Sequence, residues 1–238
     1  MGEEFDIIAR SHRLHCERYG SPSAPLVIGL PGLSGDVGNF AYLGERIGGE
    51  AMQLVALHWR GRGRSETTAP GSYGWENHAR DVLGLADALG AETFAAVGQS
   101  MGGSVAMKVA ELDGKRLDAV VLIDIAGRVD RGVGPVIEAT IGRLPLAITS
   151  SGAVAEDRAY TQTQHPYERW KHLTMPTLLV RATRELEPGA GYVVPADDRD
   201  RFLRDVPGAA VVEVDGNHLT VNTHPDTVAA VKAFLSSS

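Results

Sequence analysis

The chain alternates short, continuous apolar runs with longer segments whose apolar residues recur at helical spacing. A run such as residues 25–30 (PLVIGL) has no polar face, as expected of a strand buried on both sides of a sheet. The segment at residues 76–90 repeats apolar residues every three or four positions, which predicts a helix. Consecutive strand–helix–strand units pair their strands in parallel through right-handed crossovers. The sequence therefore predicts an α/β fold, with a mostly parallel central sheet and helices on both faces.

The same periodicities place the remaining elements. Residues 6–11 and 13–20 alternate polar and apolar side chains and predict an antiparallel hairpin at the start of the chain. Further strands are predicted at residues 52–59, 93–98, 117–127, 175–183 and 209–216, and further helices at residues 40–48, 101–112, 198–207 and 225–235.

Residues 127–173 interrupt this alternation, because they contain no clear strand. They hold a predicted helix at residues 134–144, followed by the polar and aromatic stretch YTQTQHPYERW. A connection of this length is either an inserted lid or a disordered loop, and its aliphatic and aromatic content favours an ordered lid. We therefore expect one core domain, residues 1–126 and 174–238, with residues 127–173 inserted as the lid.

The composition excludes several classes of protein. A formal net charge of −7 argues against a nucleic-acid partner, and the RGRGR run at residues 60–64 is interpreted as a solvated loop. No apolar stretch is long enough to span a membrane, and the N-terminus lacks the apolar segment of a signal peptide. Cys16 is the only cysteine, so no internal disulfide is possible. We expect a cytoplasmic protein without a nucleic-acid or membrane partner; nothing in the sequence indicates its oligomeric state.

Ser100 stands in the pattern G-x-S-x-G, between Gly98 and Gly102. A predicted strand precedes it and a predicted helix follows it, which is the setting of a nucleophile elbow. The two glycines allow the strand and the helix to approach closely, and the helix N-terminus favours a developing negative charge. A serine that only caps the helix is the alternative; the strand and helix on either side favour a nucleophile.

A serine nucleophile needs a base, and histidine has a pKa near the working pH. His218 follows the last predicted strand, and functional groups of a parallel sheet gather where its strands end. His218 is therefore the predicted base. His224 precedes Pro225 and is predicted to cap a helix or lie on the surface. The other histidines are interpreted as structural: His12, His15, His58, His78, His165 and His172.

The acid that orients the histidine has two main candidates. Asp124 interrupts the apolar strand VVLIDIA, where a carboxylate is costly unless it is paired. Glu185 follows the next strand, in a run of charged residues. The apolar surroundings favour Asp124, and Glu185 remains the alternative. Three further acids lie in a charged, helix-like stretch and are weaker candidates: Asp197, Asp198 and Asp200.

Taken together, these motifs resemble the α/β-hydrolase superfamily over nearly the whole chain. The matching pieces are GLPGLSGD, HWRGRGRSE, GQSMGG, LIDIAG and GNHLTVNTHP, in the order of the family. The resemblance implies the α/β-hydrolase fold and a triad of Ser100, Asp124 and His218. Most members carry the acid one strand later, where Glu185 stands, whereas small esterases and polyketide thioesterase domains carry it where Asp124 stands.

The resemblance also implies an oxyanion hole made by the backbone N–H groups of Met101 and Leu33. The family usually has His-Gly at the turn before Leu33, and this chain has Pro31-Gly32. The backbone donor can survive this change, since the histidine side chain is not the donor. The side chains that support the turn must then differ from those of the family.

The expected function is that of a serine hydrolase without metal or cofactor, acting on a small-molecule acyl substrate through an acyl-enzyme on Ser100. A carboxylic ester, a lactone or a thioester would fit. Alternatives are a hydrolase of carbon–carbon bonds, a non-catalytic ligand-binding relative, and a cofactor-free oxidative or cyclising enzyme. Candidate pocket residues are Gly32, Trp59, Tyr160, Tyr167 and Trp170, although aromatic residues in a lid more often form a small core of their own.

Overall fold

A computed structural model describes residues 2–33, 37–141, 151–164 and 166–237 of the chain. Eight strands of these residues form one sheet in the order β1-β2-β4-β3-β5-β6-β7-β8. The strands are β1 (Glu3–Ala9), β2 (His12–Tyr19), β3 (Leu26–Leu30), β4 (Gln53–Leu57), β5 (Phe94–Gln99), β6 (Leu117–Ile123), β7 (Thr177–Ala182) and β8 (Ala209–Val214).

The pairing of these strands confirms the predicted, mostly parallel sheet. β1 and β2 form the antiparallel hairpin, and β2 also runs antiparallel to β4. All other neighbours, from β4 through β3 to β8, are parallel. The carboxyl ends of β3 to β8 therefore meet at one edge of the sheet.

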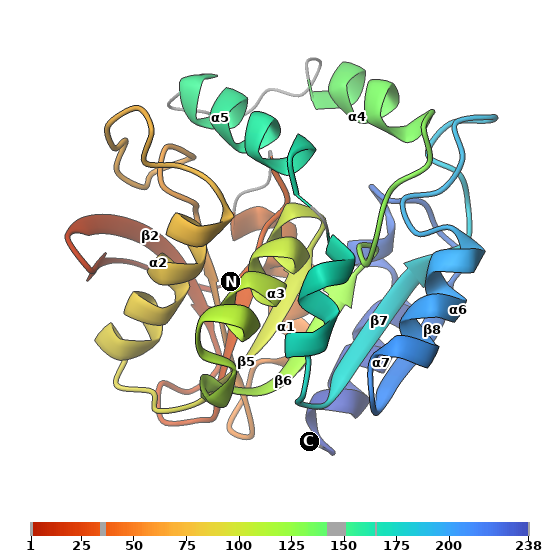
Figure 1. Cartoon of the computed structure of the whole chain (residues 1–238). Helices are drawn as coiled ribbons and strands as arrows, with labels where there is room; N and C mark the ends of the chain where they lie inside the picture. The colour runs from red at the N-terminus through yellow and green to blue at the C-terminus, as the bar shows by residue number, and fades with distance from the viewer. Residues whose placement is uncertain (1, 34–36, 142–150, 165, 238) are drawn as a thin grey trace.

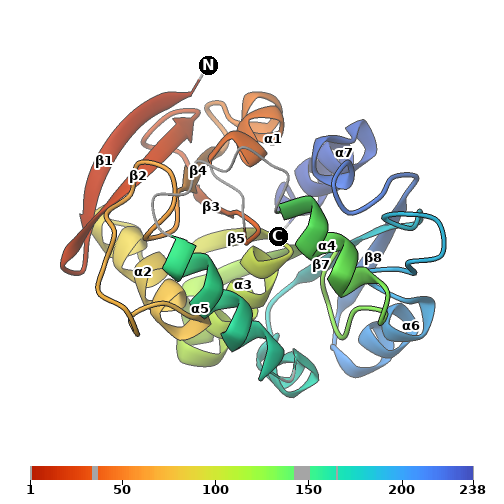
Figure 2. The same cartoon turned by 90° about the horizontal axis from the view of Figure 1, so that it is seen from above.

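Helices cover both faces of the sheet (Figures 1 and 2). One apolar cluster joins the sheet to α2, α3 and α6, and the other joins it to α1 and α7. Successive residues of a central strand serve opposite clusters: Phe94 and Ala96 of β5 point to the first, and Ala95 and Val97 to the second. The covering helices are α1 (Ala41–Ile47), α2 (Trp75–Ala88), α3 (Met101–Asp113), α6 (Ala196–Asp205) and α7 (Pro225–Leu235), with short 3-10 helices η1 (Val37–Phe40), η2 (Gly114–Arg116) and η4 (Val221–Thr223).

The predicted lid segment contains α4 (Val133–Ile141), α5 (Ser151–Gln162) and the 3-10 helix η3 (Pro166–His172). Figure 1 shows α4 and α5 above the edge where the parallel strands end. By contrast, η3 packs beside α3 and α6 in the helix layer. The helix predicted at residues 134–144 corresponds to α4, and residues 142–144 lie outside the described residues.

The start of α3 lies directly against the end of β3. A Cβ atom on Gly102 would overlap the backbone carbonyl oxygen of Leu30, and one on Gly98 would overlap the backbone of Gly102. These two glycines are therefore required by the close approach of strand and helix. The approach brings the turn after β3 and the turn after β5 together at the carboxyl edge.

We expect Gly102→Ala to destabilise the fold by about 1–3 kcal/mol, because the new methyl group can be accommodated only if backbone moves. Urea denaturation of both proteins measures the difference. Gly49→Ala is the matched control, since a Cβ there meets no atom within 4 Å. Equal losses in the two variants would contradict the close approach.

Candidate active site

Ser100 occupies the turn between β5 and α3 in a backbone conformation that is unusual for a serine. Its φ is 53° and its ψ is −121°. A positive φ costs free energy in a residue with a Cβ and persists only where the surrounding structure imposes it. The Ser100 N–H donates to the carbonyl oxygen of Ile123 on β6, at 3.2 Å, and α3 begins at the next residue. The side chain is thus held at the carboxyl edge and is half-buried.

Asp124 and His218 meet at the same edge. Asp124 directly follows β6, and its Oδ2 lies 2.9 Å from Nδ1 of His218 in the loop after β8. Its Oδ1 accepts a hydrogen bond from the backbone N–H of Ala182, at the end of β7, at 2.9 Å. The carboxylate is 2% exposed, so both of its oxygens need these donors. Three neighbouring strand ends therefore fix the orientation of one imidazole ring.

Glu185 has other partners. Its two carboxylate oxygens accept hydrogen bonds from the backbone N–H groups of Gly189 and Gly191, at 2.8 Å and 3.1 Å. It thereby closes the loop between β7 and α6. Of the two candidate acids, the structure brings Asp124 to His218 and places Glu185 in this loop.

The loop that carries His218 is also tied to the serine turn. The side-chain amide of Gln99, the residue before Ser100, donates to the carbonyl oxygen of His218 at 3.2 Å. The Asn217 side chain accepts from the N–H groups of Leu219 and Thr220, which holds the loop in a compact turn. The residue before the candidate nucleophile is thus hydrogen-bonded to the backbone of the candidate base.

Five of the other histidines contact groups outside this site. Nδ1 of His224 accepts from the N–H of Asp226, which confirms that this histidine caps α7. The remaining contacts join His12 to Asp81, His15 to Asp6, His58 to the N–H of Arg64, and His78 to Asp157. His165 lies outside the described residues.

The turn after β3 lies beside Ser100. A Cβ on Gly32 would be 3.5 Å from the Cβ of Ser100. The carbonyl oxygen of Pro31 accepts from the indole N–H of Trp59 at 3.0 Å, and that of Leu33 accepts from Nε of Arg62 at 3.2 Å. These two side chains support the turn in which the chain departs from the usual His-Gly.

A model of the alpha/beta hydrolase fold family matches residues 25–150, more than half of the chain. The chain belongs to the alpha/beta hydrolase fold family. The matched range includes the turn after β3 and the turn that carries Ser100.

Individual curated proteins match parts of the chain. The N-formylmaleamate deformylase of Pseudomonas putida is 30% identical over 119 residues, which cover 50% of this chain and 44% of that protein. The 2-heptyl-3-hydroxy-4-quinolone dioxygenase of Rhodococcus erythropolis is 32% identical over 116 residues, covering 48% and 42% respectively. The matches thus span less than half the length of either curated relative.

A solved structure extends the likeness over the whole fold. The enol-lactonase from Burkholderia xenovorans superposes with a TM-score of 0.80 at 20% identity, covering 98% of this chain and 100% of that one. At this identity the likeness shows that the two proteins share a fold.

No helix of the described residues is long and apolar enough to cross a membrane. Nor do these residues group three histidine, cysteine or carboxylate side chains as a metal site would.

Aromatic residues predicted to line a pocket of this hydrolase-family chain pack among other side chains. Trp59 is fully buried, and Trp170, which is 2% exposed, donates its indole N–H to the carbonyl of Ala126. Tyr167 meets Trp170 edge-on, with ring centroids 5.0 Å apart, and Tyr160 meets Trp75 in the same way. A role for these rings in substrate binding stays a prediction.

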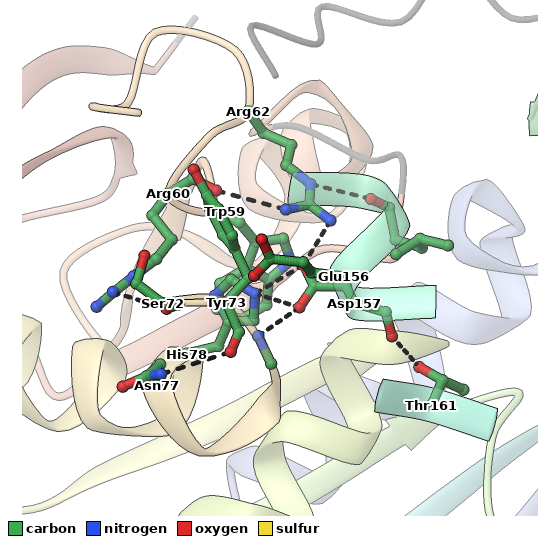
Figure 3. Close-up of polar contacts among 12 residues, drawn as sticks. Trp59, Arg60, Arg62, Ser72, Tyr73, Asn77, His78, Glu156, Asp157 and Thr161 are labelled. Atoms are coloured by element: carbon green, nitrogen blue, oxygen red, sulfur yellow. Dashed lines mark hydrogen bonds and ion pairs between the residues drawn. The ribbon is translucent and has the colours of Figure 1, made fainter. Parts of the chain in front are cut away.

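The interpretation of residues 60–64 as a solvated loop was wrong for two of its three arginines. Arg60 is 4% exposed and Arg62 is 1% exposed. Arg60 binds both carboxylate oxygens of Asp81 on α2. Figure 3 shows Arg62 beside Asp157 on α5, at 2.7 Å from a carboxylate oxygen. Only Arg64 extends to the surface, where it pairs with Glu4. The arginine run alone could not predict these partners, because Asp81 and Asp157 lie far away in sequence.

The buried Asp81 makes stability depend on pH. Burial alone would raise the pKa of its carboxyl, but hydrogen bonds from His12 and Arg60 and the Arg60 charge outweigh burial and hold that pKa below its ordinary value. A carboxyl whose pKa is lower in the folded state stabilises the protein at neutral pH. This stabilisation is lost as the pH falls through the folded-state pKa.

We expect Asp81→Asn to lower the free energy of unfolding by about 3–5 kcal/mol at neutral pH, because it leaves Arg60 buried and unpaired. The difference from the unchanged protein should shrink as the pH falls below about 4. Urea denaturation across this pH range measures it. The matched control is Asp215→Asn, which removes an exposed pair with Arg184 and should change stability little. A loss for Asp81→Asn that does not vary with pH would contradict the lowered pKa.

Proposed function

We propose that this protein is a serine hydrolase that cleaves a small-molecule carboxylic ester, lactone or thioester through an acyl-enzyme on Ser100. The observation that carries the proposal is the buried contact of 2.9 Å between Asp124 and His218. It lies at the edge where Ser100 is held in a strained turn. A nucleophile, a base and an orienting acid at neighbouring strand ends are the components of a catalytic triad.

We place the imidazole protons on the basis of the contact between Asp124 and His218. Nδ1 faces a carboxylate, so it carries the hydrogen and donates it. Nε2 is then unprotonated in the neutral ring and can accept the hydroxyl proton of Ser100. Ser100 Oγ adds to the substrate carbonyl carbon, and Asp124 stabilises the imidazolium that forms.

The remaining steps return the enzyme to its starting state. The imidazolium gives its proton to the departing alcohol or thiol as the tetrahedral intermediate collapses to an ester on Ser100. A water molecule then adds to this ester while His218 takes one of its protons. Collapse of the second intermediate releases the carboxylic acid and returns the proton to Ser100 Oγ.

We place the oxyanion of both intermediates against the backbone N–H groups of Met101 and Leu33. Met101 is the first residue of α3, so its N–H has no acceptor within the helix. Leu33 follows Gly32, which adjoins Ser100. Two such donors aimed at a developing charge supply a large part of the rate enhancement in acyl transfer.

The names of the relatives leave the bond that is cleaved open to experiment. Enol-lactonase and deformylase are consistent with a substrate that offers a carbonyl to Ser100. Hydrolysis of a carbon–carbon bond beside a ketone would use the same three residues, and it is the second candidate. The quinolone dioxygenase relative makes turnover with oxygen a further reaction to assay.

We also propose that the protein acts in a reducing compartment such as the cytoplasm, because the sequence has one cysteine and so forms no internal disulfide. Its single cysteine, Cys16, is buried in β2, and burial raises the pKa of this thiol to about 12. A thiol with this pKa remains protonated and unreactive at neutral pH.

Ser100 should react covalently with a fluorophosphonate, because the triad makes its hydroxyl nucleophilic. Mass spectrometry of a tryptic digest should find one adduct, on the peptide that contains Ser100. Ser100→Ala should abolish both labelling and the hydrolysis of p-nitrophenyl acetate. An intact Ser100 after long exposure would overturn the proposed function.

Asp124→Asn should lower kcat for the same ester by roughly 10⁴-fold. The amide would favour the wrong histidine tautomer, and it carries no charge to stabilise the imidazolium. The matched variant Glu185→Gln should retain activity within about twofold, since the hydrogen bonds of Glu185 within the described part of the chain go to loop N–H groups. Steady-state kinetics compare the two. The opposite ranking would assign the orienting role to Glu185.

A further inference from the structure

Asp157 is a fully buried carboxylate on the lid helix α5, and the proposed reaction does not use it directly. It has three partners in the core (Figure 3). Arg62 lies 2.7 Å from Oδ2, His78 Nε2 lies 2.9 Å from the same oxygen, and the N–H of Gly74, the N-cap of α2, donates to Oδ1 at 2.6 Å. Burial would raise the pKa of this carboxyl, but the charges and hydrogen bonds of His78 and Arg62 outweigh burial and lower it. Asp157 is therefore an ionised group held by the core.

Arg62 connects this carboxylate to the turn after β3. One side of its guanidinium faces Asp157, while its Nε donates to the carbonyl oxygen of Leu33 at 3.2 Å. Nη1 reaches the carbonyl of Arg60 at 3.4 Å. A planar guanidinium offers donors in several fixed directions, so one arginine can hold both partners in a defined geometry.

His78 makes a second connection from Asp157 to the same turn. Its ring packs on the indole of Trp59, with centroids 4.8 Å apart. The Trp59 N–H donates to the carbonyl oxygen of Pro31 at 3.0 Å. Both rings are buried, so a shift of His78 displaces Trp59.

The two connections end on either side of one peptide group. The carbonyl of Pro31 belongs to the peptide before Gly32, and the carbonyl of Leu33 belongs to the peptide after Leu33. The peptide between them carries the Leu33 N–H, which we have placed in the oxyanion hole. With both flanking carbonyls held, this peptide group has little freedom to rotate.

We infer that Asp157 is a positioning residue: through Arg62 and through His78 and Trp59, it holds the Leu33 N–H in its catalytic orientation. The inference rests on the proposed function, because it assigns the support of that same oxyanion site. It makes the oxyanion hole dependent on a residue of the lid helix.

Glu156, the neighbour of Asp157, provides the matched control. Its carboxylate accepts from the N–H of Gly71 at 2.9 Å, in the loop before α2, and the bond is exposed. It therefore also ties α5 to the core, but it has no contact with Arg62 or His78 among the described residues. A comparison of the two acids separates anchoring of the lid from positioning of the turn.

The experiment compares Asp157→Asn, Arg62→Lys and Glu156→Gln with the unchanged protein in p-nitrophenyl acetate hydrolysis. We expect the first two variants to lose roughly 10²-fold in kcat while KM stays within about twofold, because the donor acts on the transition state. Glu156→Gln should keep both constants within about twofold. Arg62→Lys keeps a charge for Asp157 but lacks the fork that also reaches Leu33. If Asp157→Asn does not fold, the kcat of Arg62→Lys alone tests whether the Leu33 N–H is positioned through Arg62.

Hydrogen–deuterium exchange measures the mobility of the turn after β3 and does not require catalytic activity. The peptide that covers residues 26–33 should exchange faster in Asp157→Asn and Arg62→Lys, and at the unchanged rate in Glu156→Gln. Folded Asp157→Asn and Arg62→Lys proteins with unchanged kcat and exchange would overturn the inference, as would equal losses in Glu156→Gln. If the unchanged protein hydrolyses no ester and Ser100 is not labelled, the proposed function fails. The exchange comparison then still tests whether Asp157 holds the turn.

Discussion

The fold depends on the rule that a carboxylate removed from water must be given hydrogen-bond donors and a compensating charge. Asp81, Asp124 and Asp157 are each almost completely buried, and each is satisfied by groups far away in sequence. Asp81 joins α2 to the hairpin and to the loop after β4. Asp124 joins the ends of β6 and β7 to the loop after β8, and Asp157 joins α5 to α2. Each pairing fixes the relative position of segments that the apolar clusters alone would allow to slide.

The parallel sheet decides where such groups can be of use. Its central strands are buried on both faces, so polar side chains concentrate where the strands end. The close approach at Gly102 then brings the turn after β3 to the serine elbow after β5. The Gln99 side chain ties the serine elbow to the loop of His218 by a hydrogen bond, and Trp59 and Arg62 hold the turn after β3 through two of its carbonyl oxygens. Hydrogen bonds have direction, and this suits a site in which orientation sets the rate.

Predictions from sequence succeeded where the physical reason was local. The order and type of the core elements followed from periodicity, and the position of Ser100 followed from the strand–turn–helix pattern. Asp124 stood alone in an apolar strand, so its need for a partner was visible, although the partner was not. Asp157 lies in a polar helix sequence and Arg62 in a charged run, where neither type of residue is unusual. Their burial arises only when α5 is laid across the loop after β4.

The sequence by itself determined the α/β alternation, the elbow at Ser100 and the family to which the chain belongs, because each is written in residues close together along the chain. Only the tertiary structure decided that Asp124 rather than Glu185 meets His218. It also decided that Arg62 binds a carboxylate of α5 and a carbonyl of the turn after β3 at once. These contacts join residues 29 to 95 positions apart, and their free energy depends on burial, which no local stretch of sequence specifies.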